Sequence, residues 1–408
     1  MTNWGEIMDT TSISLALSQV RRISLLTASG LLLAASLAGC AGQPATPADP
    51  DNQRAWVLGG AGELGEPGPA LVEPQQLLEI SEEMRQFTRQ ATVTGKNEGE
   101  KIRLLVEALH ADDGLALRYD ATATLTPQDA FAQRRANCMT HTLLFIALAR
   151  DIGIDARFNH VEIPPIWDMR GDHVVLYRHI NARIGASQSL FRIVDLTPEE
   201  YDPAYRQWTI TDTEAAAQFF NNRAVDLQAQ GQAREGLRYQ LRAIELDPEQ
   251  SFLWSNLGHL YLGIGNVRAA EISIRTALKL DPDSLSAYGT ATRIYEALGE
   301  HQRALNYRRQ AEYLQRRNPY YHYQLAEQAF ARNQPLRALD ESKKAISLYP
   351  EDHRFFLLLG AVLSRLDKPE LARKSIEVAI TLTADENLRS RYRSKLDRIA
   401  AATKPAPG

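Results

Sequence analysis

One cysteine, a choice of two histidines and one aspartate are the residue types of a thiol-based catalytic site. Cys138 stands at the start of an apolar stretch, and Asp195 lies later, on a predicted strand. A thiol reacts as its thiolate, which a helix N-terminus and a neighbouring histidine favour. His173 or His179 could be that histidine, and a carboxylate would then orient its ring. Together these side chains could form an activated thiol nucleophile with its base and the group that orients the base.

The stretch that follows the cysteine predicts the helix that would position it. Residues 141–151 carry apolar side chains at helical spacing, and Gly153 follows where a helix commonly ends. Asn137 is a suitable N-cap, which places Cys138 in the first turn with the helix dipole behind it. The alternative is that Cys138 is only a small hydrophobe in the core.

A predicted β-hairpin distinguishes the two histidines. Residues 173–184 and 190–196 have the patterns of two paired strands. If the loop is centred near Ser187, His179 lies directly opposite Asp195, close enough for their side chains to hydrogen-bond. The other histidine, at the start of the first strand, would project beyond the second strand. A register shift of two residues would weaken this geometry without excluding His179.

These motifs resemble the transglutaminase-like superfamily of cysteine enzymes. The matching segments are ANCMTHTLLFIALARDIGIDARF, RHINA and FRIVDL. The resemblance implies an α+β, papain-like domain over residues 75–205. It also implies that Cys138 is the nucleophile, that His179 moves the proton and that Asp195 orients the imidazole. The reaction would be acyl transfer from an amide through a thioester, to an amine or to water, on a protein or peptide substrate.

Some details of the resemblance differ or stay open. Phe191 stands where the family often has tryptophan, and no calcium-binding acidic cluster like that of the animal enzymes is visible. We therefore predict no metal and no cofactor. The backbone N–H of Cys138 is the expected oxyanion donor, with Gln133 or Tyr119 as further candidates. His141 and His160 are expected to be packing or surface groups.

The second half of the chain repeats itself. The dipeptide Asp-Pro recurs at residues 247–248 and 281–282, which are 34 residues apart, and each closes a pair of predicted helices. The unit between them resembles the tetratricopeptide repeat (TPR) at Trp254, Leu257, Gly258, Tyr261, Ala270, Ala277 and Pro282. We predict an all-α TPR solenoid of about five repeats and a closing helix over residues 214–401, which would bind a protein partner.

The N-terminus has the pattern of an export signal. Two arginines precede the apolar run 23–37, which ends in the sequence LAGC at residues 37–40. This resembles the lipobox of bacterial lipoproteins, which implies a signal peptide over residues 1–39 and a lipid anchor on Cys40. Ala41 after the cysteine favours a cell-envelope lipoprotein at the outer membrane, facing the periplasm.

Between the signal and the first domain, residues 40–74 are rich in Ala, Gly and Pro, which predicts a flexible tether. The segment contains GAGELG at residues 60–65, a literal G-x-G-x-x-G. A dinucleotide site needs a helix to open after this motif, and Pro67 and Pro69 argue against one. An exported chain also leaves Cys138 without an intramolecular disulfide partner if Cys40 carries lipid.

Composition limits the remaining possibilities. A chain of 408 residues is long enough for two domains, and a net charge of −4 with interspersed signs gives no footprint for nucleic acid. Two hypotheses therefore stand. The chain is a membrane-anchored thiol enzyme with repeats that bind a protein, or it is an assembly lipoprotein whose repeats act and whose first domain is a retired scaffold.

Overall fold

The computed structural model describes most of the chain after the predicted signal. It describes residues 47, 49–65, 70–162, 166–168, 173–175, 178–185, 192–196, 201, 205–383 and 386–402. The chain divides into two compact units, Met1–Ala45 and Thr46–Gly408, and every described residue belongs to the second. The predicted signal peptide and Cys40 lie outside the described residues. No described helix is both long and apolar enough to cross a membrane.

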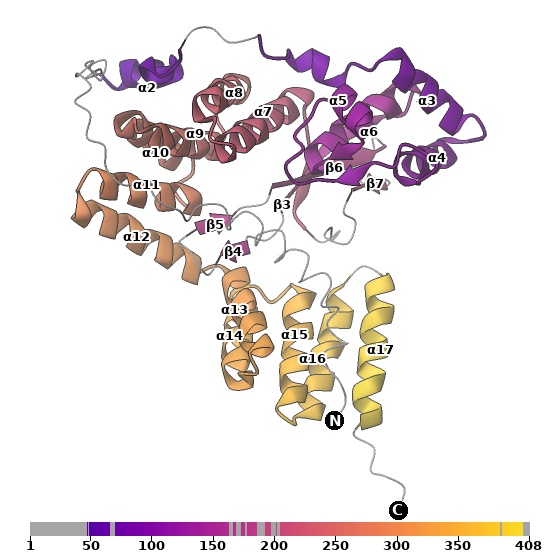
Figure 1. Cartoon of the computed structure of the whole chain (residues 1–408). Helices are drawn as coiled ribbons and strands as arrows, with labels where there is room; N and C mark the ends of the chain where they lie inside the picture. The colour runs from indigo at the N-terminus through magenta and orange to yellow at the C-terminus, as the bar shows by residue number, and fades with distance from the viewer. Residues whose placement is uncertain are drawn as a thin grey trace, which may run out of the picture. The chain divides into compact units, whose positions relative to one another are not determined.

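The first domain places its helices around one central helix, which packs on a sheet (Figure 1). Each helix begins after a residue whose side chain accepts a hydrogen bond from the first turn, which satisfies a backbone N–H that has no partner within the helix. The helices are α3 (Glu82–Thr92), α4 (Glu98–His110), α5 (Pro127–Gln133) and the central α6 (Cys138–Asp151), with a 3₁₀ turn, η3 (Pro74–Leu78), before them. Two short parallel strands, β1 (Arg118–Tyr119) and β2 (Arg135–Ala136), lead into α6.

The sheet under α6 has four antiparallel strands in the order β7-β6-β3-β8. They are β3 (Ala156–Glu162), β6 (Arg178–Ile184), β7 (Arg192–Val194) and β8 (Gln207–Ile210). Because β8 pairs with β3, the first domain extends past the predicted boundary at residue 205. The sequence prediction ended too early because β8 is short and is followed at once by a helix.

The hairpin differs from the prediction in two respects. Its first strand is divided, because β5 (His173–Val175) pairs with β4 (Ile166–Asp168) in a separate ribbon. In the main sheet, Ala182 of β6 pairs with Val194 of β7. If this pairing is continued by one residue, Asp195 lies opposite Asn181. The register is thus shifted by two residues from the predicted pairing with His179.

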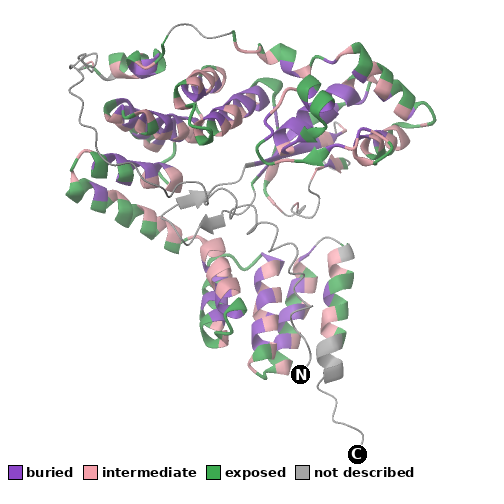
Figure 2. Cartoon of the chain, viewed as in Figure 1, coloured by how far each residue is buried: buried purple, intermediate pink, exposed green. Residues whose placement is uncertain are grey.

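The second domain is a solenoid of consecutive helix pairs, as the repeat pattern predicts. Small residues keep the paired helices close: a Cβ atom on Gly258 would lie 2.7 Å from Ile274 Cγ1, and one on Gly360 would lie 2.7 Å from Ile376 Cγ1. Figure 2 shows buried residues along the facing sides of these helices. The pairs are α7 (Asp212–Ala229) with α8 (Ala233–Leu246), α9 (Ser251–Ile264) with α10 (Val267–Leu280), α11 (Leu285–Ala297) with α12 (His301–Arg316), α13 (Pro319–Ala331) with α14 (Pro335–Leu348) and α15 (His353–Arg365) with α16 (Pro369–Leu382), and α17 (Glu386–Ala402) closes the series.

Part of the predicted tether is folded. Residues 50–63, here called the arm, form helix α2 (Pro50–Leu58) and a 3₁₀ turn, η2 (Gly60–Gly62). Two buried contacts fix the arm to the solenoid: the Tyr261 hydroxyl donates to the Val57 carbonyl at 2.6 Å, and the Asn266 amide donates to the Ala61 carbonyl at 3.4 Å. The prediction of a flexible tether is therefore wrong for this segment. Composition describes only the segment itself and cannot show that another part of the chain has a surface that binds it.

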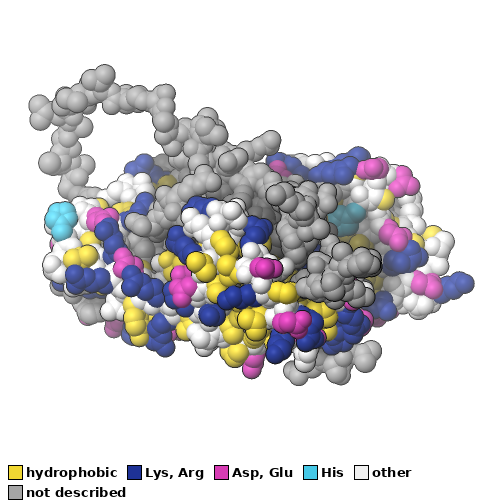
Figure 3. Space-filling view, turned by 90° about the horizontal axis from the view of Figure 1, so that it is seen from below, with side chains coloured by type: hydrophobic (Ala, Val, Ile, Leu, Met, Phe, Trp, Pro, Cys, Tyr) yellow, Lys and Arg dark blue, Asp and Glu magenta, His cyan; other side chains and the backbone are white. Residues whose placement is uncertain are grey.

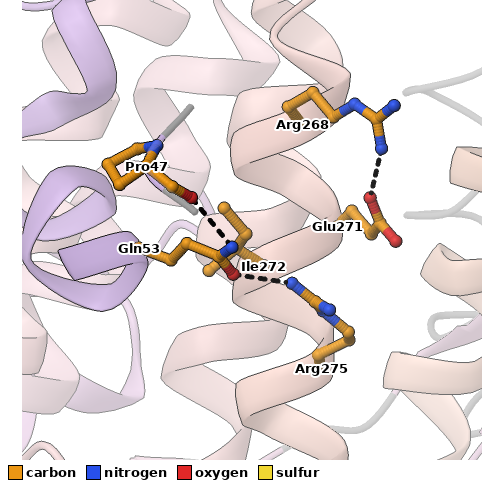
Figure 4. A pocket seen from close by; sticks show the side chains of 6 residues that line it. All are labelled: Pro47, Gln53, Arg268, Glu271, Ile272 and Arg275. Carbon is orange, nitrogen blue, oxygen red and sulfur yellow. Dashed lines mark hydrogen bonds and ion pairs between the residues drawn. The ribbon is translucent and has the colours of Figure 1, made fainter. Parts of the chain in front are cut away.

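The G-x-G-x-x-G motif serves the turn of this arm. Gly60 and Gly62 have φ angles of 84° and 81°, which glycine adopts at no steric cost. A Cβ atom on Gly60 would also lie 2.4 Å from Leu64 Cγ. Figure 4 shows the neighbouring contact, where the Gln53 side chain bridges the Pro47 carbonyl and Arg275 of α10.

On the face in Figure 3, basic and acidic side chains are interspersed around an apolar area. This distribution agrees with the near balance of charge in the sequence.

Candidate active site

Cys138 is the first residue of α6, and the helix cap holds it there. The Asn137 side chain accepts a hydrogen bond from the backbone N–H of Thr140 at 2.9 Å, as the sequence predicts for an N-cap. The Asn137 amide also donates to the Thr124 hydroxyl at 2.8 Å. The Cys138 side chain is a free thiol and is half-buried. Its backbone N–H has no acceptor within the helix, since the first turn of a helix leaves its N–H groups unpaired.

Helix α6 is a rigid support for this cysteine. Every residue from Met139 to Ala149 is buried. The Thr142 hydroxyl lies 2.8 Å from the carbonyl of Cys138 and 3.1 Å from the carbonyl of Ile180, which is the residue after His179 in β6. This one hydroxyl therefore connects the turn that carries the cysteine to the strand that carries the histidine.

His179 is buried in β6 between Asp195 and Cys138. Its Nε2 atom lies 2.6 Å from Asp195 Oδ2, and its side chain also hydrogen-bonds the Cys138 side chain. Burial lowers the pKa of His179, but the hydrogen bonds with Asp195 and Cys138 raise it more, to about 10. The ring is thus held as an imidazolium next to the thiol.

Asp195 follows directly after β7, and its side chain is 3% exposed. The same oxygen that contacts His179 also accepts a hydrogen bond from the Asn181 amide at 2.9 Å. Asp195 reaches the histidine diagonally, because Asn181 and not His179 lies opposite it in the ladder. The structure therefore brings the three predicted residues together, with a register that differs from the predicted one.

The other candidates from the sequence take different positions. His173 lies in β5, outside the four-stranded sheet, and its side chain is outside the described residues, as is Phe191. Tyr119 of β1 is 42% exposed. Gln133 is exposed and accepts a hydrogen bond from Arg135 at 3.0 Å. Neither is assigned a role as oxyanion donor.

His141 and His160 are packing groups in the core, in agreement with the sequence prediction. The His141 ring stacks on that of His110 with centroids 5.2 Å apart, and His160 packs on Trp208 with centroids 4.6 Å apart. Burial, and next the neighbouring His110, lower the pKa of His141 to about 3. His141 is therefore neutral at physiological pH, although it is one helical turn from Cys138.

Sequence reasoning missed the polar residues that surround the triad. Asn181 contacts Asp195, and Thr142 contacts both elements that carry the reactive side chains. Alternation in the predicted strand could have indicated Asn181, which is two residues from His179 and so on the same face. In the part of the chain that the structure describes, no three His, Cys, Asp or Glu side chains gather as a metal site would require.

A half-buried thiol at a helix N-terminus, an imidazolium beside it and a carboxylate on the far ring nitrogen form a geometry suited to nucleophilic acyl transfer. The histidine can give a proton to a leaving group and take one from an incoming nucleophile. The carboxylate fixes the ring and stabilises its positive charge.

Two family models match parts of the chain. The model of the transglutaminase-like superfamily matches residues 85–176, which include Cys138 and end before the other two residues of the triad. A tetratricopeptide-repeat model matches residues 253–284, which include most of α9 and all of α10. No curated protein matches the sequence.

Solved structures of TPR proteins are similar to part of this chain. YrrB, described as a TPR protein with an unusual peptide-binding site, is 18% identical; the alignment covers 44% of this chain and 92% of YrrB, with a TM-score of 0.23. TTC0263, a thermophilic TPR protein of Thermus thermophilus, is 22% identical and covers 44% of this chain and 99% of its own, with a TM-score of 0.24. PilF of Pseudomonas aeruginosa is 14% identical, with coverages of 47% and 90% and a TM-score of 0.25.

The chain thus contains a transglutaminase-like α+β domain followed by a tetratricopeptide-repeat solenoid.

Proposed function

We propose that this chain is a cell-envelope lipoprotein, anchored through Cys40, that acts as a cysteine-dependent acyltransferase or amide hydrolase. The observation that carries the proposal is the contact of His179 with both Asp195 and the Cys138 thiol, at the N-terminus of a buried helix. A retired scaffold has no need to keep a buried imidazolium beside a half-exposed thiol.

The reaction proceeds in two halves. The Cys138 thiolate attacks the carbonyl carbon of a carboxamide or peptide bond, and the Cys138 backbone N–H donates to the oxyanion. The C–N bond breaks as His179 gives its proton to the leaving nitrogen, which leaves a thioester on sulfur. An amine or water then gives a proton to His179 and attacks the thioester carbonyl. The C–S bond breaks and the thiolate returns.

The repeats supply the binding surface for a protein, as the substrate or as a partner that presents it. Large apolar side chains are exposed on the second helices of the later repeats and are available to contact such a protein. Examples are Leu336, at 72% exposed, and Leu371, at 49%. The lipid would hold the chain at the membrane that faces the periplasm, where the substrate would be another envelope protein or peptide.

Labelling of the thiol tests the catalytic half of this proposal without a known substrate. The full chain is treated with iodoacetamide at neutral pH, and modification of Cys138 is followed by mass spectrometry. We expect labelling at least tenfold faster than that of an ordinary exposed thiol, because the imidazolium stabilises the thiolate. His179→Ala and Asp195→Ala should reduce the rate, and His301→Ala, on the exposed surface of the solenoid, should not.

Substrate trapping and complementation separate the proposal from its alternative. We expect a mass adduct on Cys138 after incubation with envelope extract, and a loss of function in Cys138→Ser, His179→Ala and Asp195→Ala. If the thiol shows ordinary reactivity and all three variants complement a deletion, while a chain that lacks the solenoid does not, the chain is an adaptor. Radiolabelled palmitate on the wild type, and none on Cys40→Ala, would test the anchor separately.

A further inference from the structure

Three strands of the four-stranded sheet, β6, β3 and β8, each contribute one polar side chain to a continuous row that ends on Asp195, the residue after β7. The Asn181 amide donates to Asp195 at 2.9 Å, and the Asn159 amide donates to Asn181 Oδ1 at 2.9 Å. The Asn159 amide also donates to Gln207 Oε1 at 3.0 Å, and the Tyr201 hydroxyl donates to the same oxygen at 3.0 Å. The row follows the strand order β7-β6-β3-β8 from the catalytic carboxylate to the far edge.

The ladder explains why these side chains meet. Asn159 and Asn181 are directly paired in the β3–β6 register, and Asp195 takes the next place opposite Asn181. Directly opposed side chains lie within hydrogen-bond reach on the same face of a sheet. The observed register of the hairpin differs by two residues from the predicted one. This difference places Asp195 opposite Asn181 and not opposite His179.

The orientation of the amides follows from the carboxylate. An ionised carboxylate only accepts, so Asn181 must turn its NH₂ group toward Asp195 and its oxygen toward Asn159. Asn159 must then turn its own NH₂ group toward Asn181. The donors thus point toward the triad, and the Asp195 oxygen that contacts His179 is the oxygen that Asn181 holds.

The row is costly for stability. Asn159 and Asn181 are both 0% exposed, and the Asn159 oxygen has no hydrogen-bond partner among the described residues. A buried polar group without a partner destabilises a fold, and a β-branched apolar residue would suit a central strand better. Two buried amides in neighbouring strands are therefore better explained by a task at the triad than by packing.

Asp195 also needs such a support. It lies one residue past the end of β7, where the backbone ladder no longer fixes its position. Resting on the proposed function, we propose that Asn181 is a positioning residue that holds the Asp195 carboxylate against His179, and that Asn159 orients Asn181 for this task. Loss of the Asn181 amide would remove a hydrogen bond from the same oxygen that contacts the ring and so weaken its alignment.

The experiment measures the pH–rate profile of Cys138 alkylation by iodoacetamide in the full chain. Asn181→Leu and Asn181→Thr both remove the amide, and threonine is well suited to a strand. We expect both variants to react about 10- to 100-fold more slowly than wild type near neutral pH, as loss of a hydrogen bond to a charged group predicts. The acidic limb of the profile should also move to higher pH. Asn159→Val should cause a smaller change in the same direction.

The control is Asn256→Leu, which removes a similar amide bond to Asn221 inside the solenoid and should leave the profile unchanged. Thermal unfolding is measured on every variant, because a merely structural role would lower the unfolding temperature without moving the acidic limb. If wild type reacts fast and both Asn181 variants follow its profile, the positioning role is overturned while the proposed function stands. If wild type itself reacts as an ordinary thiol, the proposed function is overturned.

Discussion

At the scale of single residues, two buried histidines of the first domain respond to their surroundings in opposite ways. His179 hydrogen-bonds Asp195 on one side and the Cys138 side chain on the other, and these contacts raise its pKa, so its ring is held protonated. His141 is fully buried beside another imidazole, that of His110, and burial and this neighbour lower its pKa, so its ring is held neutral. For each histidine the pKa in the folded chain differs from that in the unfolded chain, so each makes the stability of the domain depend on pH. The effect of His179 falls at alkaline pH and that of His141 at acidic pH.

His179 should make the domain less stable at alkaline pH. Its pKa is raised from 6.5 to about 10 in the folded chain, so the stabilisation is fully present below pH 6.5 and is lost as the pH rises through about 10. We expect the free energy of unfolding to fall by on the order of a few kcal/mol over this range. Scanning fluorimetry at a series of pH values would show it. In His179→Gln, which cannot titrate, the decline should be smaller; parallel curves would contradict the assignment.

His141 should make the domain less stable at acidic pH. Its pKa is lowered from 6.5 to about 3, so the unfolded chain binds a proton that the folded chain rejects. The stabilisation is present above pH 6.5 and is lost as the pH falls toward about 3. We expect His141→Gln to retain more of its neutral-pH unfolding temperature at about pH 4 to 5 than wild type does. His301→Gln, at an exposed position, is the matched control, and an equal loss in all three proteins would refute the prediction.

At the scale of elements, the geometry of the site depends on how α6 is fixed to β6. Besides the contact between His179 and Cys138, the Thr142 hydroxyl is a polar link between them, because it contacts the carbonyls of Cys138 and Ile180. Thr142 is 1% exposed, so water cannot replace the hydroxyl.

Removal of that hydroxyl should loosen the site. Thr142→Val keeps the shape of the side chain and leaves the Ile180 carbonyl without this donor, which should destabilise the domain by about 1–3 kcal/mol. Thr142→Ser keeps the hydroxyl and serves as the control. Urea unfolding gives the stability, and iodoacetamide labelling gives the reactivity of Cys138. We expect Thr142→Val to lower both and Thr142→Ser to lower neither by a comparable amount. Equal behaviour of the two variants would exclude a role for the hydroxyl.

The elements that could be predicted are those with strong local signals. Helix α6 consists largely of apolar residues that are buried, and Asn137 caps its N-terminus; both features can be recognised in the sequence. The repeats are visible because their signature returns after 34 residues. The pairing of the hairpin was predicted with the wrong register, because register depends on the conformation of its loop as well as on the strand pattern. His179 and Asp195 still meet, since a diagonal neighbour is within reach of a histidine.

The parts that could not be predicted depend on distant partners. Strand β8 has only four residues, and what defines it is its pairing with β3. The buried Asn181 and Asn159 reveal their task only when the ladder is known. The folded state of the arm could not be predicted for the same reason. Its composition is that of a linker, and its buried hydrogen bonds with Tyr261 and Asn266 join residues that are 204 and 205 positions apart in the sequence.

At the scale of the whole molecule, the arm shortens the predicted tether. Only nine residues separate Cys40 from Pro50, where the arm begins. Fully extended, ten residue steps span at most about 36 Å. With the proposed lipid on Cys40, the first repeats would therefore stay close to the membrane, and the substrates within reach would be those near its surface.

Release of the arm is the test at this scale. Val57 is 0% exposed and its carbonyl accepts the Tyr261 hydroxyl, so an aspartate at this position would place a charge in an apolar site, which costs several kcal/mol. We expect Val57→Asp to detach residues 50–63 from the solenoid and to expose Arg54 to trypsin. In wild type, Arg54 lies over the Trp254 ring, 4.9 Å from its centroid. The measurement is the rate of cleavage after Arg54 under native conditions, followed by N-terminal sequencing.

Val93→Asp makes the same change at a position that is 78% exposed and should leave the rate as in wild type. Equal rates of cleavage for Val57→Asp and wild type would mean that the buried contact at Val57 does not hold the arm on the solenoid.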